Sequence, residues 1–210
     1  MDKIISNEML DSLREEIRAK MSEKRFSHTL GVEREIKRLC KIFDVDNAAL
    51  MQSGALLHDI TKEYSPERHL GIMEEHGIDT EYYKKQNHKV YHSLTAALII
   101  PQEYEDFADS DLIRAVSVHT TGCADMTLFD KLLYLADYIE DTRTFPDCVA
   151  LREYFYDGIE RGEDKYAHLE KTMLLSFDMT LRDLIECGSV ISDKTVEARN
   201  SLLYKAKKGE

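Results

Sequence analysis

The stretch "LFDKLLYLADYI", residues 128–139, decides the fold class. Its apolar residues recur at i, i+4, i+7 and i+11, the spacing that places side chains on one face of an α-helix. They are Leu128, Leu132, Leu135 and Ile139. The stretch therefore predicts an amphipathic helix whose apolar face packs against a core.

Helical periodicity also dominates the sequence on both sides of this stretch. It recurs in residues 36–43 and 112–119. A long helical run covers residues 163–188 and ends at its terminal glycine, since glycine readily adopts the left-handed conformation that closes a helix. A further helix is expected from about Lys194.

The segment "KVYHSLTAALII", residues 89–100, is the best candidate for a strand because it contains β-branched residues. Residues 93–100 nevertheless fit a short helix better, and we expect it to end before Pro101. No segment rich in glycine, serine and proline divides the chain. We therefore predict an all-α, single-domain helical bundle over residues 1–210, with its core at about 20–205 and about nine or ten helices.

The composition limits the possible partners. The chain has 210 residues, of which 43% are hydrophobic, and a formal net charge of −12. Nucleic acids and anionic membranes attract basic proteins, so we expect neither as a partner. A small anionic substrate remains possible where local cations or a metal ion reverse the field.

Several features of the sequence suggest a cytoplasmic protein. The four cysteines form no C-x-x-C pair and are spread over the chain, which is typical of reduced thiols. The first residues, "MDKIISNEML", do not resemble a signal peptide, and no stretch approaches the roughly 18 apolar residues of a membrane span. We therefore expect the protein to be cytoplasmic.

Four of the eight histidines lie on apolar helix stripes and are expected to point inward. They are His28, His58, His92 and His119. A buried imidazole needs a partner, because an unpaired polar group is costly in the interior. The other four lie in charged stretches, and we expect them to be solvated: His69, His76, His88 and His168.

Two aspartates follow apolar runs and share this requirement for a partner. Asp59 ends "GALLHD" and Asp137 ends "KLLYLAD", so both carboxylates are expected to be at least partly buried. Imidazole and carboxylate without thiolate suit iron, manganese, zinc or nickel. Six donors exceed the three or four of a single zinc site, which indicates two metal ions that share a carboxylate. The alternative is that these side chains merely pair with one another.

The pattern of His28, the adjacent His58 and Asp59, and Asp137 resembles the H…HD…D signature of HD-domain metal-dependent phosphohydrolases. Longer blocks resemble the YqeK family, and they extend from Arg25 to about Leu203. The blocks are "RFSHTLGVE", "GALLHDITK", "VYHSLTAALII", "VHTTG", "DKLLYLADYIEDTRTFP" and "TVEARNSLL". Members of that family hydrolyse diadenosine tetraphosphate symmetrically to two ADP, so the resemblance implies this activity.

The resemblance also implies roles for individual residues. The principal metal, expected to be iron, would be bound by His28, His58, Asp59 and Asp137. His92 and His119 would complete a second metal position or contact substrate phosphate, and manganese or another divalent ion is also possible.

The catalytic residues implied by the resemblance are Asp59, Lys62, His92 and His119. Phosphate and nucleotide contacts would come from Arg25, Lys62, Arg143 and Asp137, and from a turn after His119. That turn consists of Thr120, Thr121 and Gly122, where glycine leaves space for a ligand.

Two positions depart from the family pattern. Ser192 and Asp193 stand where the family commonly has a His-Pro pair, so contacts to the base are in doubt, and Ser93 replaces a glycine. Other HD phosphohydrolase substrates remain open: guanosine tetraphosphate, a deoxynucleotide or a cyclic dinucleotide. A non-catalytic nucleotide-binding protein is a further alternative, and a homodimer is expected only on the base rate for soluble proteins.

Overall fold

The computed structural model describes residues 4–208, and this part of the chain contains α-helices, turns and two short 3-10 helices but no β-strand. The elements are α1 (Asn7–Arg18), α2 (Glu23–Ile42), α3 (Ala48–Leu57), α4 (Pro66–Glu75), α5 (Thr80–Tyr83), η1 (His88–Val90), α6 (Tyr91–Glu103), η2 (Glu105–Phe107), α7 (Ser110–Val118), α8 (Leu128–Ile139), α9 (Pro146–Glu160), α10 (Lys165–Glu186) and α11 (Asp193–Lys208). The all-α prediction is confirmed.

The described residues contain eleven α-helices, slightly more than the nine or ten expected. The short helix α5 has too few residues for a periodic pattern to form. Residues 1–3 and 209–210 of the expected domain lie outside the described part. None of the helices within residues 4–208 combines the length and the apolar character needed to cross a membrane.

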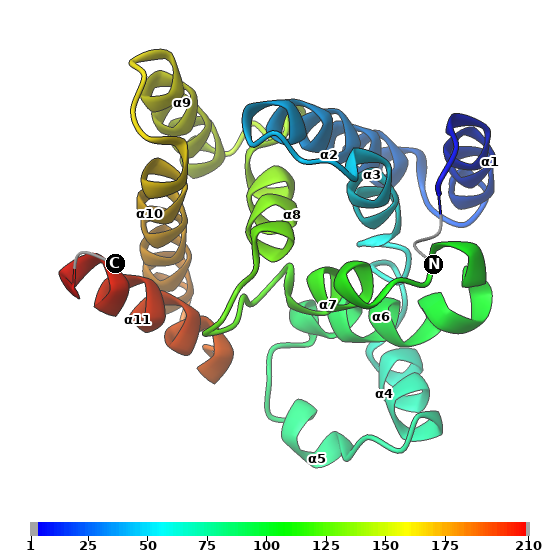
Figure 1. The fold of residues 1–210 in the computed structure, drawn as a ribbon. Coiled ribbons are helices and arrows are strands. Elements are labelled where there is room, and N and C mark those ends of the chain that lie inside the picture. Colours follow the sequence, from blue (N-terminus) through cyan, green and yellow to red (C-terminus); the bar gives the residue numbers. More distant parts are fainter. Residues whose placement is uncertain (1–3, 209–210) are drawn as a thin grey trace.

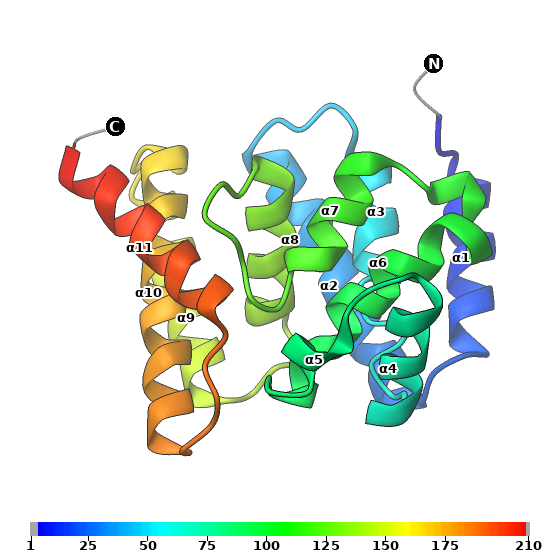
Figure 2. The ribbon, with the colours of Figure 1, turned by 90° about the horizontal axis from the view of Figure 1, so that it is seen from below.

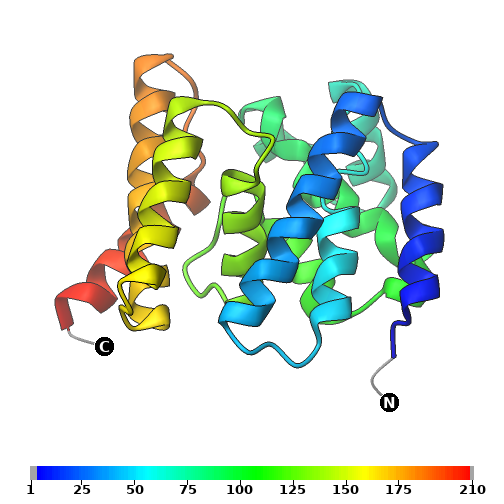
Figure 3. The same ribbon diagram turned by 90° about the horizontal axis from the view of Figure 1, so that it is seen from above.

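Helix α8 lies at the centre of the molecule (Figures 1, 2 and 3). Helices α9, α10 and α11 lie on one side of it, whereas α1, α2, α3, α6 and α7 lie on the other. Helices α4 and α5 extend below α6 in the view of Figure 1. Of these elements, α2, α3, α7 and α9 contact α8 directly.

The apolar face of α8 explains this position. Leu132, Leu135 and Ile139 are fully buried, and Leu128 packs against the core from its edge. Asp137 lies on the same helix with a side chain that is only 20% exposed. The helix predicted from the opening stretch is confirmed, and it carries a carboxylate into the interior.

Polar side chains cap most of the helix starts, because the first backbone N–H groups of a helix lack partners within it. The capping side chains belong to Ser6, Ser22, Asn47, Ser65, Asp79, Asp109, Thr127 and Asp164. The predicted end of the long helix is also confirmed. Gly188 has a φ of 63°, and the Ser189 N–H donates to the Leu184 carbonyl at 2.8 Å.

The prediction that residues 93–100 end before Pro101 is wrong. Helix α6 runs from Tyr91 to Glu103 with Pro101 inside it. Proline removes one hydrogen bond, but its fixed φ fits a helix. The last turn is held by the Tyr104 N–H, which donates to the Ile100 carbonyl at 2.9 Å, and by burial of both side chains.

Two histidines expected to be solvated are buried. The His69 ring bonds through Nδ1 to the Thr95 hydroxyl at 2.7 Å. His168 bonds through Nε2 to the Phe155 carbonyl at 3.0 Å and packs against Gly158. The prediction is wrong for these two because both are covered by residues distant in sequence, which the charged local stretches do not reveal. His76 is half-buried and His88 is exposed, as expected for the latter.

Candidate metal centre

The six predicted donors converge from five helices into one cluster beside α8. His28 lies on α2, His58 is the C-cap of α3 with Asp59 directly after it, His92 lies in the first turn of α6, His119 is the C-cap of α7, and Asp137 lies on α8. They form two groups that meet at His58 and Asp59. The ligating atoms of His28, His58 and Asp137 lie within 4.8 Å of one another, as do those of His58, Asp59 and His119. Residues that are up to about half the chain apart are therefore brought together.

The first group surrounds one oxygen of each carboxylate. His28 Nε2 lies 3.0 Å from Asp137 Oδ1 and 3.7 Å from Asp59 Oδ2. His58 Nε2 lies 3.8 Å and 3.4 Å from the same two oxygens. Two imidazoles and two carboxylates thus enclose a small volume.

The second group surrounds the other oxygen of Asp59. Its Oδ1 lies 3.2 Å from His92 Nε2 and 3.8 Å from His119 Nε2, and these two nitrogens are 3.1 Å apart. Asp59 therefore directs one oxygen to each group. Such an arrangement suits a carboxylate shared by two metal ions about 3.5–4 Å apart.

The orientation of two imidazoles favours metal ligation. His58 Nδ1 donates to the Ala55 carbonyl at 2.6 Å, and His119 Nδ1 donates to the Val116 carbonyl at 2.7 Å. With the proton on Nδ1, the lone pair of Nε2 faces the cluster, which is the tautomer that metal ligation requires.

Several buried atoms of the cluster have no hydrogen-bond partner: His28 Nε2, His58 Nε2 and Asp59 Oδ1. If the side chains merely paired with one another, these atoms would remain unsatisfied at a cost of about 1–3 kcal/mol each. A divalent cation satisfies the lone pairs of imidazole and carboxylate together. The donor set therefore fits a metal ion better than the pairing alternative.

Burial and charge set the ionisation of the cluster. Burial lowers the pKa of His58 and of His92, so both imidazoles are neutral. Burial by itself would raise the pKa of Asp59 and of Asp137. Interactions with the His58 and His119 imidazoles for Asp59, and the positive charge of Arg143 for Asp137, outweigh it and hold both pKa values well below the ordinary range.

The ionisation of His28 differs from that of the other histidines. Burial would lower its pKa, but the neighbouring carboxylates of Asp137 and Glu140 raise it to about 9. Metal ligation requires the neutral imidazole, so metal binding at His28 releases a proton.

The three predicted cations lie at the cluster, and two of them pair with its carboxylates. Arg25 donates to Asp59 Oδ2 at 2.6 Å, and Arg143 donates to Asp137 Oδ1 at 2.5 Å. Lys62 Nζ lies 3.1 Å from His92 Nε2, and burial lowers its pKa. The arginines therefore orient the carboxylates, while the amine of Lys62 faces the second group.

The turn after His119 is divided between the cluster and the core. The Thr120 hydroxyl lies 3.1 Å from His92 Nε2. The buried Thr121 hydroxyl donates to the Gly122 carbonyl at 3.1 Å. A Cβ on Gly122 would lie 2.6 Å from Phe177 Cζ, so protein packing fills the space that was expected to admit a ligand.

A cavity of about 260 Å³ opens from the cluster towards α10 and α11. We call it the α10–α11 cavity. Its lining residues are Lys62, Asn87, Lys89, Val90, His119, Thr120, Tyr134, Asp137, Tyr138, Arg143, Thr180, Leu184, Val190, Ser192 and Thr195. Aromatic and aliphatic side chains on one side and cations on the other suit a nucleoside phosphate. Ser192, at the position that departs from the family pattern, is part of this lining.

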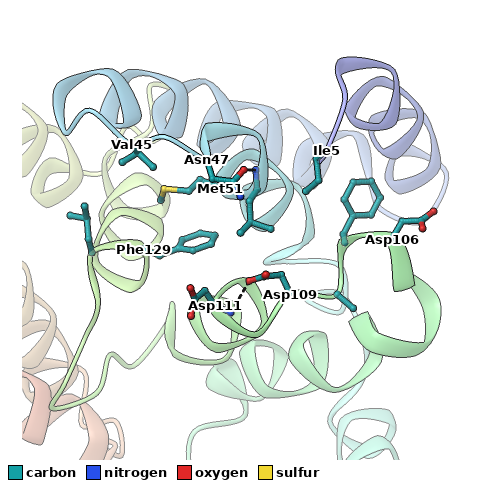
Figure 4. Close-up of a pocket in the computed structure, with 12 residues that line it drawn as sticks. Ile5, Val45, Asn47, Met51, Asp106, Asp109, Asp111 and Phe129 are labelled. Carbon is teal, nitrogen blue, oxygen red and sulfur yellow. Dashed lines mark hydrogen bonds between the residues drawn. The ribbon is translucent and has the colours of Figure 1, made fainter. Parts of the chain in front are cut away.

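Another hollow, of about 550 Å³, lies apart from the cluster between the starts of α3, α7 and α8 (Figure 4). Asp106, Asp109 and Asp111 face it together with Met51 and Phe129. Among the described residues, no lysine, arginine or histidine lines it. Its charge therefore does not suit a phosphate ligand, in contrast to the α10–α11 cavity.

Sequence reasoning missed one carboxylate of the site. Glu140 is fully buried and accepts a hydrogen bond from His28 Nδ1 at 3.0 Å. Gly31 leaves room for it, because a Cβ there would lie 2.2 Å from Glu140 Oε2. Residue spacing is the signal that could have indicated Glu140. Glu140 lies three residues after Asp137, and Gly31 lies three residues after His28, so each pair shares a helix face.

The fold and the site define the class of the protein: an all-α protein with a buried centre of histidines and aspartates for divalent metal ions. The model of the HD domain matches residues 25–141, and the chain belongs to the HD domain family. All six donors lie within the matched residues. The resemblance drawn from the H…HD…D signature is thereby confirmed.

Similar proteins cover nearly the whole chain. A symmetrical bis(5'-nucleosyl)-tetraphosphatase of Staphylococcus aureus is 28% identical over 88% of this chain and 90% of its own. One of Halalkalibacterium halodurans is 24% identical over 91% and 95%. A Clostridium acetobutylicum structure, described as a predicted HD superfamily hydrolase involved in NAD metabolism, is 30% identical, with a TM-score of 0.81 over 93% and 97%.

Proposed function

We propose that the protein hydrolyses diadenosine tetraphosphate to two ADP with the help of divalent metal ions. One observation carries the proposal: buried imidazole and carboxylate atoms without hydrogen-bond partners lie beside Asp137, which lines a cavity together with Lys62, Lys89 and Tyr138. The relatives named symmetrical tetraphosphatases favour this substrate over the other nucleotides considered.

Different residues of the chain would bind the metal ions and orient the metal-binding carboxylates. Bound divalent ions would supply charge neutralisation at the phosphates and lower the pKa of the attacking water. Asp59 would be a ligand common to both groups. Arg25 and Arg143 orient the carboxylates of Asp59 and Asp137, and the charge of Arg143 keeps Asp137 ionised.

Lys62 and Lys89 supply the positive charge that the polyphosphate needs in an acidic protein. Both side chains line the cavity at the cluster. Cations directed at the non-bridging oxygens stabilise the transition state of phosphoryl transfer. The Thr120 hydroxyl, beside His92, is placed to orient a phosphate oxygen or a water molecule.

Product identification tests the proposal. Protein prepared without oxygen and loaded with ferrous iron or with manganese should convert diadenosine tetraphosphate to ADP alone. ATP together with AMP would contradict symmetrical cleavage. Metal analysis of the same preparation tests the expectation that iron is the resident ion.

A matched pair of variants tests the metal centre. Asp59→Ala should lose metal binding and turnover together, because it removes the carboxylate common to both groups. Asp141→Ala removes a surface carboxylate that pairs with Arg34, and it should retain both properties. Full activity of Asp59→Ala would remove the basis of the proposal.

A cytoplasmic location and a homodimer stay predictions.

A further inference from the structure

A second cavity, of about 250 Å³, opens from the cluster on the side of α4. We call it the α4 cavity. Its lining residues are Lys62, Glu63, Tyr64, Pro66, His69, His88, Lys89 and His92. Lys62 and Lys89 also line the α10–α11 cavity, so the two cavities share a wall of positive charge.

The metal cluster lies where the two cavities approach each other. His92 lines the α4 cavity, whereas His119 and Asp137 line the α10–α11 cavity. The Nε2 atoms of His92 and His119 are only 3.1 Å apart. A phosphate chain at the cluster can therefore extend into both cavities, past the two shared lysines.

The lining of the α4 cavity suits a nucleoside. Tyr64 presents a half-buried ring, one face of which is covered by the Arg68 guanidinium, 3.6 Å from the ring centre. The His69 ring lies 5.9 Å from the Tyr64 ring and is anchored by the Thr95 hydroxyl. A tyrosine ring held in this way can stack on any nucleobase through its other face.

The one carboxylate of the α4 cavity is already engaged. Glu63 accepts hydrogen bonds from the Ser22 N–H at 2.8 Å and from the Ser22 hydroxyl at 2.5 Å. The cavity therefore offers Lys62, Lys89 and aromatic side chains to a ligand. This combination resembles that of the α10–α11 cavity, which pairs the same lysines with Tyr134 and Tyr138.

The two volumes also match the symmetry of the substrate. The cavities measure about 250 and 260 Å³, each below the roughly 300–1,000 Å³ of a pocket for a complete drug-sized ligand. Cleavage at the middle of a symmetrical dinucleotide requires equivalent halves on the two sides of the reacting phosphates. Two similar cavities on either side of the metal cluster meet that requirement.

We propose that the α4 cavity binds the second nucleoside of the dinucleoside polyphosphate while the α10–α11 cavity binds the first. This assignment rests on the proposed function. It makes Tyr64 a specificity-determining residue, because the stacking face at Tyr64 distinguishes a substrate with two nucleosides from one with a single nucleoside.

The test compares two ligands that carry the same number of phosphates. Diadenosine tetraphosphate has two nucleosides and adenosine 5'-tetraphosphate has one. The affinity of the second is read from its KM or from its competitive inhibition of the first. Tyr64→Ala should raise the KM for diadenosine tetraphosphate by roughly tenfold, since a lost stacking contact has about this effect. Its affinity for adenosine tetraphosphate should change by less than about twofold.

Three further variants make the outcome decisive. Tyr64→Phe keeps the ring and should retain the KM, which separates stacking from folding. Tyr138→Ala, in the α10–α11 cavity, should weaken both ligands. Tyr204→Ala removes an exposed tyrosine outside both cavities and should change neither.

An unchanged KM in Tyr64→Ala, or an equal loss for both ligands, would overturn the assignment. Failure of the wild-type enzyme to release ADP from diadenosine tetraphosphate would instead refute the proposed function.

Discussion

Glu140 shows how one buried residue orients a proposed metal ligand. Its carboxylate accepts hydrogen bonds from His28 Nδ1, from the Thr142 N–H at 2.6 Å and from the Thr142 hydroxyl at 2.7 Å. These bonds fix the His28 ring so that Nε2 faces Asp137. Outer partners of this kind orient a ligand and raise its basicity.

The substitution Gly31→Ala tests the hydrogen bond between Glu140 and His28 without changing either residue. Its Cβ would lie 2.2 Å from Glu140 Oε2 and would displace the carboxylate from His28. We expect metal affinity to fall by about 10–100-fold, measured by competition with a chelator. Gly71→Ala is the control, because its Cβ meets nothing within 4 Å. It should keep the metal affinity and stabilise α4 by about 1 kcal/mol. Equal affinities in the two variants would contradict the role of Glu140.

His69 should make the stability of the protein depend on pH. Burial lowers its folded pKa to about 4, whereas the unfolded chain titrates near 6.5. Between these values the unfolded state binds more protons. The contribution of His69 is therefore complete above about pH 6.5 and is lost as the pH falls towards 4. His69→Gln should flatten the free energy of unfolding between pH 6.5 and 4.5, measured by urea denaturation. The exposed His88→Gln serves as control, and identical slopes for His69→Gln and wild type would contradict the prediction.

Among the elements, the sequence predicts correctly those helices that have a regular apolar stripe or a residue that marks the helix end. Helix α8 has a clean apolar stripe, and α10 ends at a glycine with φ of 63°. The continuation of α6 through Pro101 could not be predicted, because it depends on packing of Tyr104 against residues elsewhere in the chain.

Within the site, too, the residues marked by local sequence could be predicted, and those that depend on distant packing could not. His28, His58, His92 and His119 were found because each lies on an apolar stripe of its own helix. Glu140 was missed because it follows Tyr138 and Ile139 at a helix end, where a polar residue looks solvated. Only the approach of α2 at Gly31 shows that its carboxylate is enclosed.

The loop between α7 and α8 depends on glycine for two separate reasons. Gly122 has a φ of 68°, and a Cβ there would meet Phe177 of α10 and Ala198 of α11. Gly162, between α9 and α10, has a φ of 75° but open space around it. The two positions therefore separate backbone strain from packing.

Gly122→Ala should destabilise the fold more than Gly162→Ala does. The left-handed conformation alone costs an alanine about 1–2 kcal/mol, which Gly162→Ala measures. The clash with Phe177 should add about 1–3 kcal/mol in Gly122→Ala. Chemical denaturation of both variants gives the two values, and equal losses would mean that Phe177 moves aside without cost.

At the scale of the whole molecule, the proposed metal centre joins five helices that also pack through apolar side chains and polar contacts. Its donors come from α2, α3, α6, α7 and α8 and from the residue after α3. The net charge of −12 would repel a polyphosphate, but Arg25, Lys62, Lys89 and Arg143 gather at the centre. The fold thus concentrates positive charge at one place in an acidic protein.

Because the donors belong to five helices, removal of the metal should lower the stability of the entire chain. A ligand at 100 times its dissociation constant stabilises the folded state by about 2.7 kcal/mol. For a chain of this size each kcal/mol corresponds to about 2–4 °C, so a chelator should lower the Tm by roughly 5–10 °C. Scanning calorimetry of loaded and chelated protein measures the shift. Asp59→Ala, which lacks the shared carboxylate, should unfold at the same temperature with and without chelator. An equal response of wild type and variant would show that the chelator acts elsewhere, and no response of the wild type would show that the cluster binds no metal tightly.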